Sequence, residues 1–309
     1  MHIRIGTRGS QLALWQAQDM AQKLEANGCT TEIITISTKG DEMLDVSIAK
    51  IGSKGVFTEA IEAQLASGHI DIAVHSAKDL QSTLPDGFDI IAFLTREKVN
   101  DVLISHQQGV SLAQESIVVG TSSTRRVATL KQYFPHVKTV AVRGNLQTRI
   151  KKMKEGACDA LMLAYAGVHR MGFEEMIAEE LSHDVFIPAV GQGCVAVEVH
   201  EGLDDERRNF LHERLSDSKT STCVWAERSF LKQMEGGCSV PVFAYCTLHE
   251  QQLHIKGGVI SLDGKEKVIK TLEDHKANSA ALGKKLAKEV LNSGGREILA
   301  KIKKELNEE

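Results

Sequence analysis

Residues 117–164 have the sequence IVVGTSSTRRVATLKQYFPHVKTVAVRGNLQTRIKKMKEGACDALMLA. Short apolar stretches in this region alternate with segments of helical periodicity. Alternating strands and helices favour a mainly parallel sheet that helices cover on both faces, which is an α/β fold. The pattern predicts three strands, over residues 117–120, 139–143 and 159–164, and helices that begin near Thr124, Asn145 and Ala166.

The regions on either side extend this organisation. The N-terminal region repeats the alternation, with predicted strands over 2–7, 31–38 and 70–75. The last hundred residues differ, because a predicted helix over 220–235 is followed by strands and an Asp263-Gly264 hairpin signal, which indicates an α+β unit. We predict a first α/β domain over 1–95 and 195–214, a second over 96–194 and a smaller α+β domain over 215–309.

Composition excludes several classes of protein. Hydrophobic residues make up 42% and charged residues 25% of the 309 residues, as in globular proteins. A net charge of -4 argues against nucleic-acid or membrane binding, and residues 160–168, the longest apolar stretch, are too short to span a bilayer. The six cysteines lack metal or disulfide spacing and no signal peptide is recognisable, which predicts reduced thiols, no metal and a cytoplasmic location.

Positive charge is concentrated in residues 120–154, which contain nine Lys and Arg residues and no Asp or Glu. Arg125 and Arg126 follow a strand at a hydroxyl-rich turn, and Arg143 ends the next strand, so guanidinium groups and helix N–H groups favour a carboxylate or phosphate ligand. The lysines at 151–154 are typical of a solvated helix face. No nucleotide-binding loop or nucleic-acid signature is present, which favours a small polyanion.

Two further residues have a functional and a structural interpretation. Asp79 follows an apolar strand beside Lys78, where it either forms a turn or stabilises a positive charge near the strand end. Cys238 follows Gly236-Gly237, so it is either an inert thiol or a nucleophile that needs an unusual backbone conformation.

Six ordered motifs across essentially the whole chain resemble those of the porphobilinogen deaminase (hydroxymethylbilane synthase) family. They are GTRGSQLALW at 6–15, AVHSAKD at 73–79, VGTSSTRR at 119–126, VRGN at 142–145, PAVGQG at 188–193 and EGGC at 235–238. The chain departs from the usual family pattern at Gly9, Ala77, Thr124 and Ser239.

The resemblance implies two similar domains like those of periplasmic binding proteins, with mainly parallel sheets, and a smaller third domain. It also implies an enzyme, a monomer, that joins four porphobilinogen molecules head to tail and releases ammonia at each step. A dipyrromethane cofactor would be attached to Cys238 through a thioether. The alternative is a noncatalytic two-lobed anion-binding module.

The resemblance also assigns roles to individual residues. Asp79 would stabilise the cationic azafulvene-like electrophile that forms when the substrate loses ammonia. The cofactor-binding positions are Lys78, Ser122, Ser123, Arg125 and Arg126. The substrate-binding positions are Arg8, Ser10, Arg143, Asn145, Arg149, Arg170 and Gln192, with Lys50 and Lys54 in a further family-like stretch.

Overall fold

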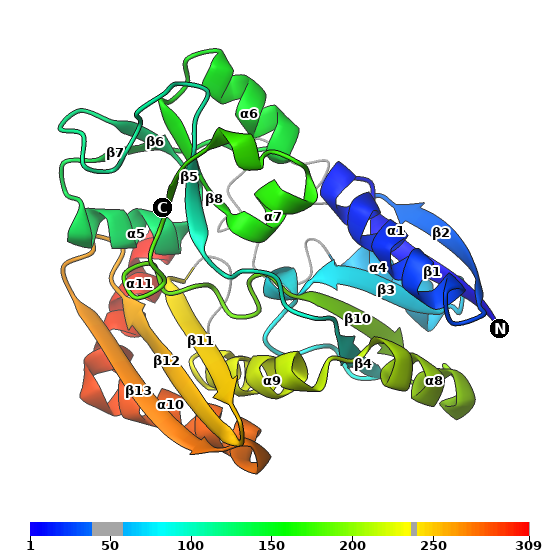
Figure 1. Ribbon diagram of the computed structural model, residues 1–309. Coiled ribbons are helices and arrows are strands. Elements are labelled where there is room, and N and C mark those ends of the chain that lie inside the picture. Colours follow the sequence, from blue (N-terminus) through cyan, green and yellow to red (C-terminus); the bar gives the residue numbers. More distant parts are fainter. Residues whose placement is uncertain (39–57, 236–239, 309) are drawn as a thin grey trace. The chain divides into compact units, whose positions relative to one another are not determined.

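The computed structural model describes residues 1–38, 58–235 and 240–308 and divides into two compact units (Figure 1). The first unit comprises residues 1–97 and 193–221, and the second comprises residues 98–192 and 222–309. Within the described ranges, no helix is long and apolar enough to cross a bilayer.

The first unit is built on a five-stranded sheet with the order β2-β1-β3-β10-β4. Strand β1 runs parallel to its two neighbours, β2 and β3, whereas β10 runs antiparallel to both β3 and β4. The strands are β1 (His2–Arg8), β2 (Thr30–Ile36), β3 (Ile72–Ser76), β4 (Phe88–Phe93) and β10 (Val195–His200). The helices in the described residues of this unit include α1 (Gln11–Glu25), α4 (Glu59–Ala66) and α8 (Asp205–Leu215).

Helix α1 covers this sheet because its apolar side chains recur on one face. Met20 and Leu24 are fully buried and belong to the same core as Ile3 and Ile5 of β1. Gly6 in β1 adjoins a different core cluster, that of Ile61, Leu65 and Ile70, where a Cβ would lie 2.2 Å from Cδ1 of Ile70, so the side chain of Ile70 would have to move.

The second unit contains a five-stranded sheet with the order β7-β6-β8-β5-β9. Strand β6 runs parallel to β7 and β8, whereas β5 runs antiparallel to β8 and β9. The strands are β5 (Asp101–Ile104), β6 (Val118–Gly120), β7 (Lys138–Val140), β8 (Ala160–Ala164) and β9 (Ile177–Glu180). The helices are α5 (Thr124–Tyr133), α6 (Leu146–Lys154) and α7 (Tyr165–Arg170), with a 3₁₀ turn at Glu174–Met176 before β9.

The two five-stranded sheets share one topology. In the spatial order of each sheet, three parallel strands lie next to one strand that runs antiparallel to both of its neighbours. This strand is β10 in the first unit and β5 in the second, and in each case it is the first strand after the chain has passed from the other unit. The predicted fold class is therefore confirmed, although parallel and antiparallel strand pairs are equally frequent within each sheet.

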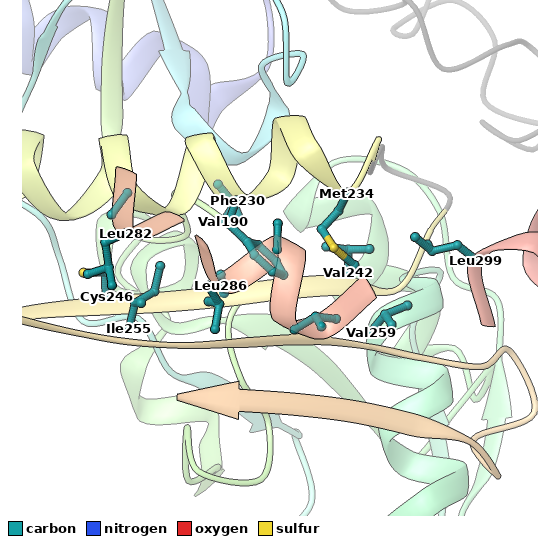
Figure 2. Packing of buried hydrophobic residues seen from close by; sticks show 14 of the residues in the cluster. Val190, Phe230, Met234, Val242, Cys246, Ile255, Val259, Leu282, Leu286 and Leu299 are labelled. Atoms are coloured by element: carbon teal, nitrogen blue, oxygen red, sulfur yellow. The ribbon is translucent and has the colours of Figure 1, made fainter. Parts of the chain in front are cut away.

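The C-terminal part of the second unit is α+β, as the sequence predicts. Its antiparallel sheet has the order β11-β12-β13, and Phe230 of α9, Leu286 of α10 and Met234, which directly follows α9, pack against it in one core (Figure 2). The described elements are α9 (Ser218–Gln233), β11 (Val242–His249), β12 (Gln252–Ile260), β13 (Lys267–His275), a 3₁₀ turn (Lys276–Asn278), α10 (Ser279–Val290), a kink over Leu291–Gly295 and α11 (Arg296–Glu308).

This α+β part packs closely on α5. A Cβ on Gly264, in the β12–β13 hairpin, would lie 2.7 Å from the carbonyl oxygen of Ala128, so only glycine fits this approach. The second unit thus combines residues of the predicted second and third domains, and the three-domain division at the stated boundaries stays a prediction.

Candidate active site

Strand β3 of the first unit positions Lys78 and Asp79. The backbone N–H of Ala77 donates to the carbonyl of Cys194 at 2.9 Å, which fixes the 3₁₀ turn Ala77–Asp79 to the chain beside β10. Ala77 and Leu80 are buried, Lys78 is half-buried and Asp79 is exposed. The turn therefore presents a carboxylate to solvent at the carboxyl end of a buried strand, where α/β proteins bind ligands.

Arg8 and Ser10 lie at the carboxyl end of β1, the strand next to β3. Both are half-buried, and the hydroxyl of Ser10 accepts a hydrogen bond from the N–H of Ala13 at 3.3 Å as the N-cap of α1. The first unit thus brings Arg8 to the same sheet edge as Asp79, because neighbouring parallel strands end at one edge.

In the second unit, β6 and the N-terminus of α5 position the predicted cofactor-binding residues. The hydroxyl of Ser122 donates to the carbonyl of Val142 at 3.1 Å. Ser123 is the N-cap residue of α5, and its side chain makes no capping hydrogen bond. The helix start therefore keeps a hydroxyl group that is not used to cap the helix, directly before Arg125 and Arg126.

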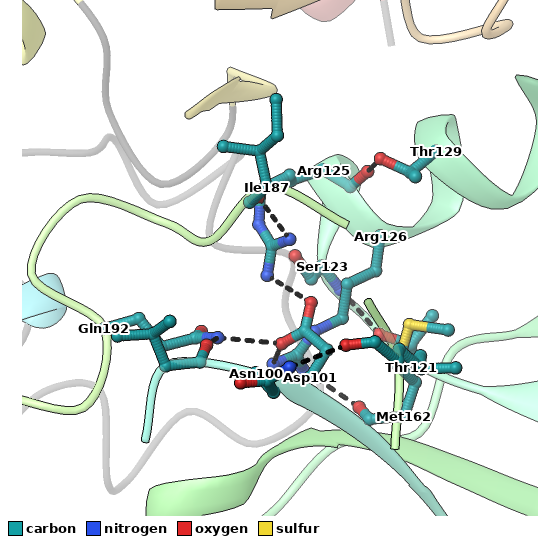
Figure 3. A network of polar contacts seen from close by, with 12 residues as sticks. Asn100, Asp101, Thr121, Ser123, Arg125, Arg126, Thr129, Met162, Ile187 and Gln192 are labelled. Atoms are coloured by element: carbon teal, nitrogen blue, oxygen red, sulfur yellow. Dashed lines mark hydrogen bonds and ion pairs between the residues drawn. The ribbon is translucent and has the colours of Figure 1, made fainter. Parts of the chain in front are cut away.

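Arg125 and Arg126 are buried and share one carboxylate, that of Asp101 (Figure 3). Nη2 of Arg125 donates to Oδ2 of Asp101 and Nη2 of Arg126 donates to Oδ1, each at 2.7 Å. The Nη1 atoms donate to the carbonyls of Ile187 and Met162, each at 2.9 Å. We call Asp101, Arg125, Arg126 and Gln192 the Asp101 network.

The Asp101 network has strong electrostatic coupling. Burial by itself would raise the pKa of Asp101, but attraction to Arg125 and then Arg126, with hydrogen bonds from Arg126 and Gln192, holds it well below its usual range. Burial lowers the pKa of Arg125, and Asp101 opposes that shift. One carboxylate between two guanidinium groups leaves an excess positive charge, and Nε of Arg126 has no hydrogen-bond partner among the described residues.

Gln192 has a structural position that its predicted substrate contact does not explain. Its side chain is buried, and Nε2 donates to the carbonyl of Val99 at 2.7 Å and to Oδ1 of Asp101 at 2.9 Å. The amide therefore orients the carboxylate that holds the arginine pair.

Arg143, Asn145 and Arg149 lie together at the start of α6. Asn145 is the N-cap, and its Oδ1 accepts from the N–H of Thr148 at 2.9 Å. Nε of Arg149 donates to the carbonyl of Gly144 at 2.7 Å, which holds the guanidinium group over the turn. Arg170 is the last residue of α7, the helix that directly follows strand β8, and it is half-buried.

The sequence reading missed Asp101 as a site residue. Asp101 is the first residue of the apolar strand β5. Because residues 120–154 contain basic residues but no Asp or Glu, the sequence could have indicated that an acidic residue from another segment pairs with the buried arginines. Cys238, Lys50 and Lys54 lie outside the described residues. Within the described ranges, no group of three or more His, Cys, Asp or Glu side chains is placed to hold a metal ion.

Comparisons with known proteins identify similar sequences along nearly the whole chain. Residues 3–208 match the family model "Porphobilinogen deaminase, dipyromethane cofactor binding domain", and residues 221–292 match "Porphobilinogen deaminase, C-terminal domain". The porphobilinogen deaminase of Desulfosudis oleivorans is 50% identical over 307 residues, which cover 99% of each chain. That of Cytophaga hutchinsonii is 51% identical over 306 residues, which cover 99% of this chain and 98% of the relative.

Among solved structures, the VFT2 domain of Bordetella pertussis BvgS is similar with a TM-score of 0.44 and 16% identity. The matched region covers 74% of this chain and 92% of that domain.

Proposed function

The chain belongs to the porphobilinogen deaminase family, and from this premise we propose that it joins four porphobilinogen molecules head to tail into hydroxymethylbilane and releases ammonia at each step. Family membership makes the chain an enzyme of the transferase class. The observation that carries the proposal is the match of two family models that together extend from residue 3 to residue 292. A noncatalytic two-lobed anion-binding module is not favoured, because the relatives that match nearly the whole chain are deaminases.

The dipyrromethane cofactor suits the side chains at the start of α5. Each pyrrole ring of dipyrromethane carries an acetate and a propionate group, so the cofactor requires fixed positive charge and hydrogen-bond donors. The excess positive charge of the Asp101 network, the buried Nε of Arg126 and the hydroxyl of Ser123 supply both. We propose that Ser122, Ser123, Arg125 and Arg126 bind these carboxylates, together with Lys78.

We propose Cys238 as the attachment point of the cofactor through a thioether. When bound, dipyrromethane would supply the pyrrole ring to which the first substrate unit is joined. A thiolate is a far better nucleophile than a hydroxyl group at neutral pH, which suits a cysteine to this role.

Asp79 is proposed as the catalytic carboxylate. Loss of ammonia leaves positive charge on the substrate, and an exposed carboxylate at the end of β3 can stabilise that charge and accept a proton afterwards. The half-buried Arg8, Arg143, Arg149 and Arg170 would bind the acetate and propionate groups of the substrate and the growing product, with Ser10, Asn145 and Gln192 as further predicted contacts. Lys50 and Lys54 as further contacts and a monomeric state stay predictions from the family resemblance, and a cytoplasmic location stays a prediction from the cysteine pattern and the lack of a recognisable signal peptide.

The intact mass of the purified protein tests this proposal. The mass is expected to exceed the sequence mass by one dipyrrole unit, and peptide mapping is expected to assign that increment to the peptide with Cys238. Thiol reductants should leave it in place, because a thioether, unlike a disulfide, is not reducible by exchange. Cys238→Ser should lose the increment, whereas Cys29→Ser, in the first unit, should keep it. An active protein with an unmodified, alkylatable Cys238 would overturn the proposal.

A further inference from the structure

Glu227 in α9 is a buried carboxylate bound by backbone groups of two other segments. Its side chain is fully buried; Oε2 accepts a hydrogen bond from the N–H of Gly191 and Oε1 accepts one from the N–H of Cys246, each at 2.9 Å. A buried carboxylate is costly unless hydrogen bonds compensate it, so these two hydrogen bonds help to hold Glu227 in this place.

The first of these hydrogen bonds leads to the arginine pair. Gly191 directly precedes Gln192, whose amide donates to Oδ1 of Asp101 at 2.9 Å. Asp101 in turn binds Arg125 and Arg126 at 2.7 Å. Fixing the backbone at Gly191 therefore fixes the amide that orients the shared carboxylate.

The second hydrogen bond joins the elements on either side of Cys238. Helix α9 ends at Gln233 and β11 begins at Val242, so these two elements adjoin the segment that contains Cys238. The Glu227–Cys246 hydrogen bond connects them, and Phe230 of α9 and Met234, which directly follows α9, pack in the same core as Val242 and Cys246 (Figure 2).

We propose that Glu227 is a positioning residue, which holds the elements flanking Cys238 and the cofactor-binding arginine pair in one fixed arrangement. This inference rests on the proposed function. One buried carboxylate would thus hold α9 and β11, the described elements on either side of Cys238 in the chain, together with the segment that orients the guanidinium groups. Preorganisation of this kind strengthens binding because the groups need not be ordered when the ligand arrives.

The variant Glu227→Gln isolates this role, because glutamine has nearly the shape of glutamate but only one oxygen. One of the two backbone N–H groups would then face an amide NH₂ group and lose its acceptor. A matched control is Asp159→Asn: Oδ2 of Asp159 accepts a hydrogen bond from the N–H of Val118 at 2.7 Å in the same unit, outside the Asp101 network.

The experiment measures cofactor loading in folded protein. Apoprotein of each variant is incubated with porphobilinogen, and intact mass spectra give the rate at which the dipyrrole increment appears. Loading of Glu227→Gln is expected to slow about tenfold, the effect of one lost hydrogen bond to a charged group. Asp159→Asn is expected to lower Tm while it loads at the wild-type rate. The double variant Glu227→Gln with Gln192→Met should load no more slowly than the slower single variant, because both changes act on one network.

The outcomes separate this inference from the proposed function. Absence of the increment in wild-type protein would overturn the proposed function itself. A loaded wild type together with normal loading of Glu227→Gln would overturn only the positioning role. If Glu227→Gln does not fold, Glu227→Asp decides: its carboxylate lies one methylene closer to the backbone and cannot keep both hydrogen bonds at their present length, so loading is expected to slow, and loading at the wild-type rate would overturn the inference.

Discussion

Asp101 accepts a hydrogen bond from Nη2 of Arg125 at 2.7 Å, at a place where the side chains are 0% and 6% exposed. The same carboxylate binds Arg126 through its other oxygen, so one negative charge holds two guanidinium groups close together. Two of the positions that the family resemblance assigns to cofactor binding, Arg125 and Arg126, thus depend on an acidic residue that lies 24 and 25 positions earlier in the chain.

Asp101→Asn should destabilise the protein by about 3 to 5 kcal/mol, because removal of one partner leaves buried charges uncompensated. Urea unfolding at neutral pH measures the loss of free energy. Asp89→Asn is the control, since the side chain of Asp89 is 59% exposed and its ion pair with Arg208 lies at the surface; its expected effect is below about 1 kcal/mol. Equal effects of the two variants would contradict the buried role of Asp101.

The Asp101 network should also make stability depend on acid pH. The pKa of Asp101 is lower in the folded chain than its unfolded value of about 3.9, so its contribution is complete above about pH 4 and is lost as the pH falls through the folded value. The difference in unfolding free energy between wild type and Asp101→Asn should therefore shrink between about pH 4 and pH 3. A difference that stays constant over this range would show that the carboxylate is not held in its charged form.

Asp79→Asn should leave the fold intact, because Asp79 is exposed, but should lower turnover by about 100-fold or more. A neutral amide can neither balance the positive charge of the substrate nor accept its proton. Asp79→Glu should retain more activity. Consumption of porphobilinogen by cofactor-loaded protein is the measurement, and near-wild-type turnover of the Asn variant would remove Asp79 from the catalytic role.

The arginines should differ in the step that they affect. Arg126→Leu should impair cofactor assembly, whereas Arg149→Leu, at the start of α6, should mainly stall elongation and leave enzyme with too few pyrroles. Each lost charge-assisted contact is expected to reduce binding about tenfold to a hundredfold. Lys151→Ala serves as the control, because its side chain is 75% exposed. Identical mass spectra of intermediates for both arginine variants would contradict this division.

Local structure could be predicted wherever periodicity and capping residues agree. The predicted helix start at Thr124 is that of α5, and Asn145 caps α6 where a helix was expected to begin. The Asp263-Gly264 signal is the β12–β13 hairpin, with Gly264 at a φ of 77°. These features depend on contacts between residues that are close in sequence, which a single sequence records directly.

Pairings between distant segments could not be predicted in the same way. Nothing in the sequence of β10 indicates that it lies between β3 and β4, more than a hundred residues earlier in the chain. The ion pair between Asp101 and Arg126 and the hydrogen bond from the Gln192 amide to Asp101 were not predicted for the same reason. Their polar atoms come together only when three segments of the chain meet. Gln192 stays a substrate contact predicted from its motif, and its buried amide binds Asp101 in addition.

The position of β10 has a consequence for folding during synthesis on the ribosome. Strands β3 and β4 cannot acquire their shared neighbour until residues 195–200 have emerged, whereas all five strands β5 to β9 are already available at residue 180. The later sheet can therefore be completed before the earlier one, and the edges of β3 and β4 stay unpaired in the meantime. Pulsed hydrogen exchange on ribosome-bound chains that expose residues 1–190 should find protected amides in β8 and unprotected ones at the β10-facing edge of β3; protection at that edge would contradict this order.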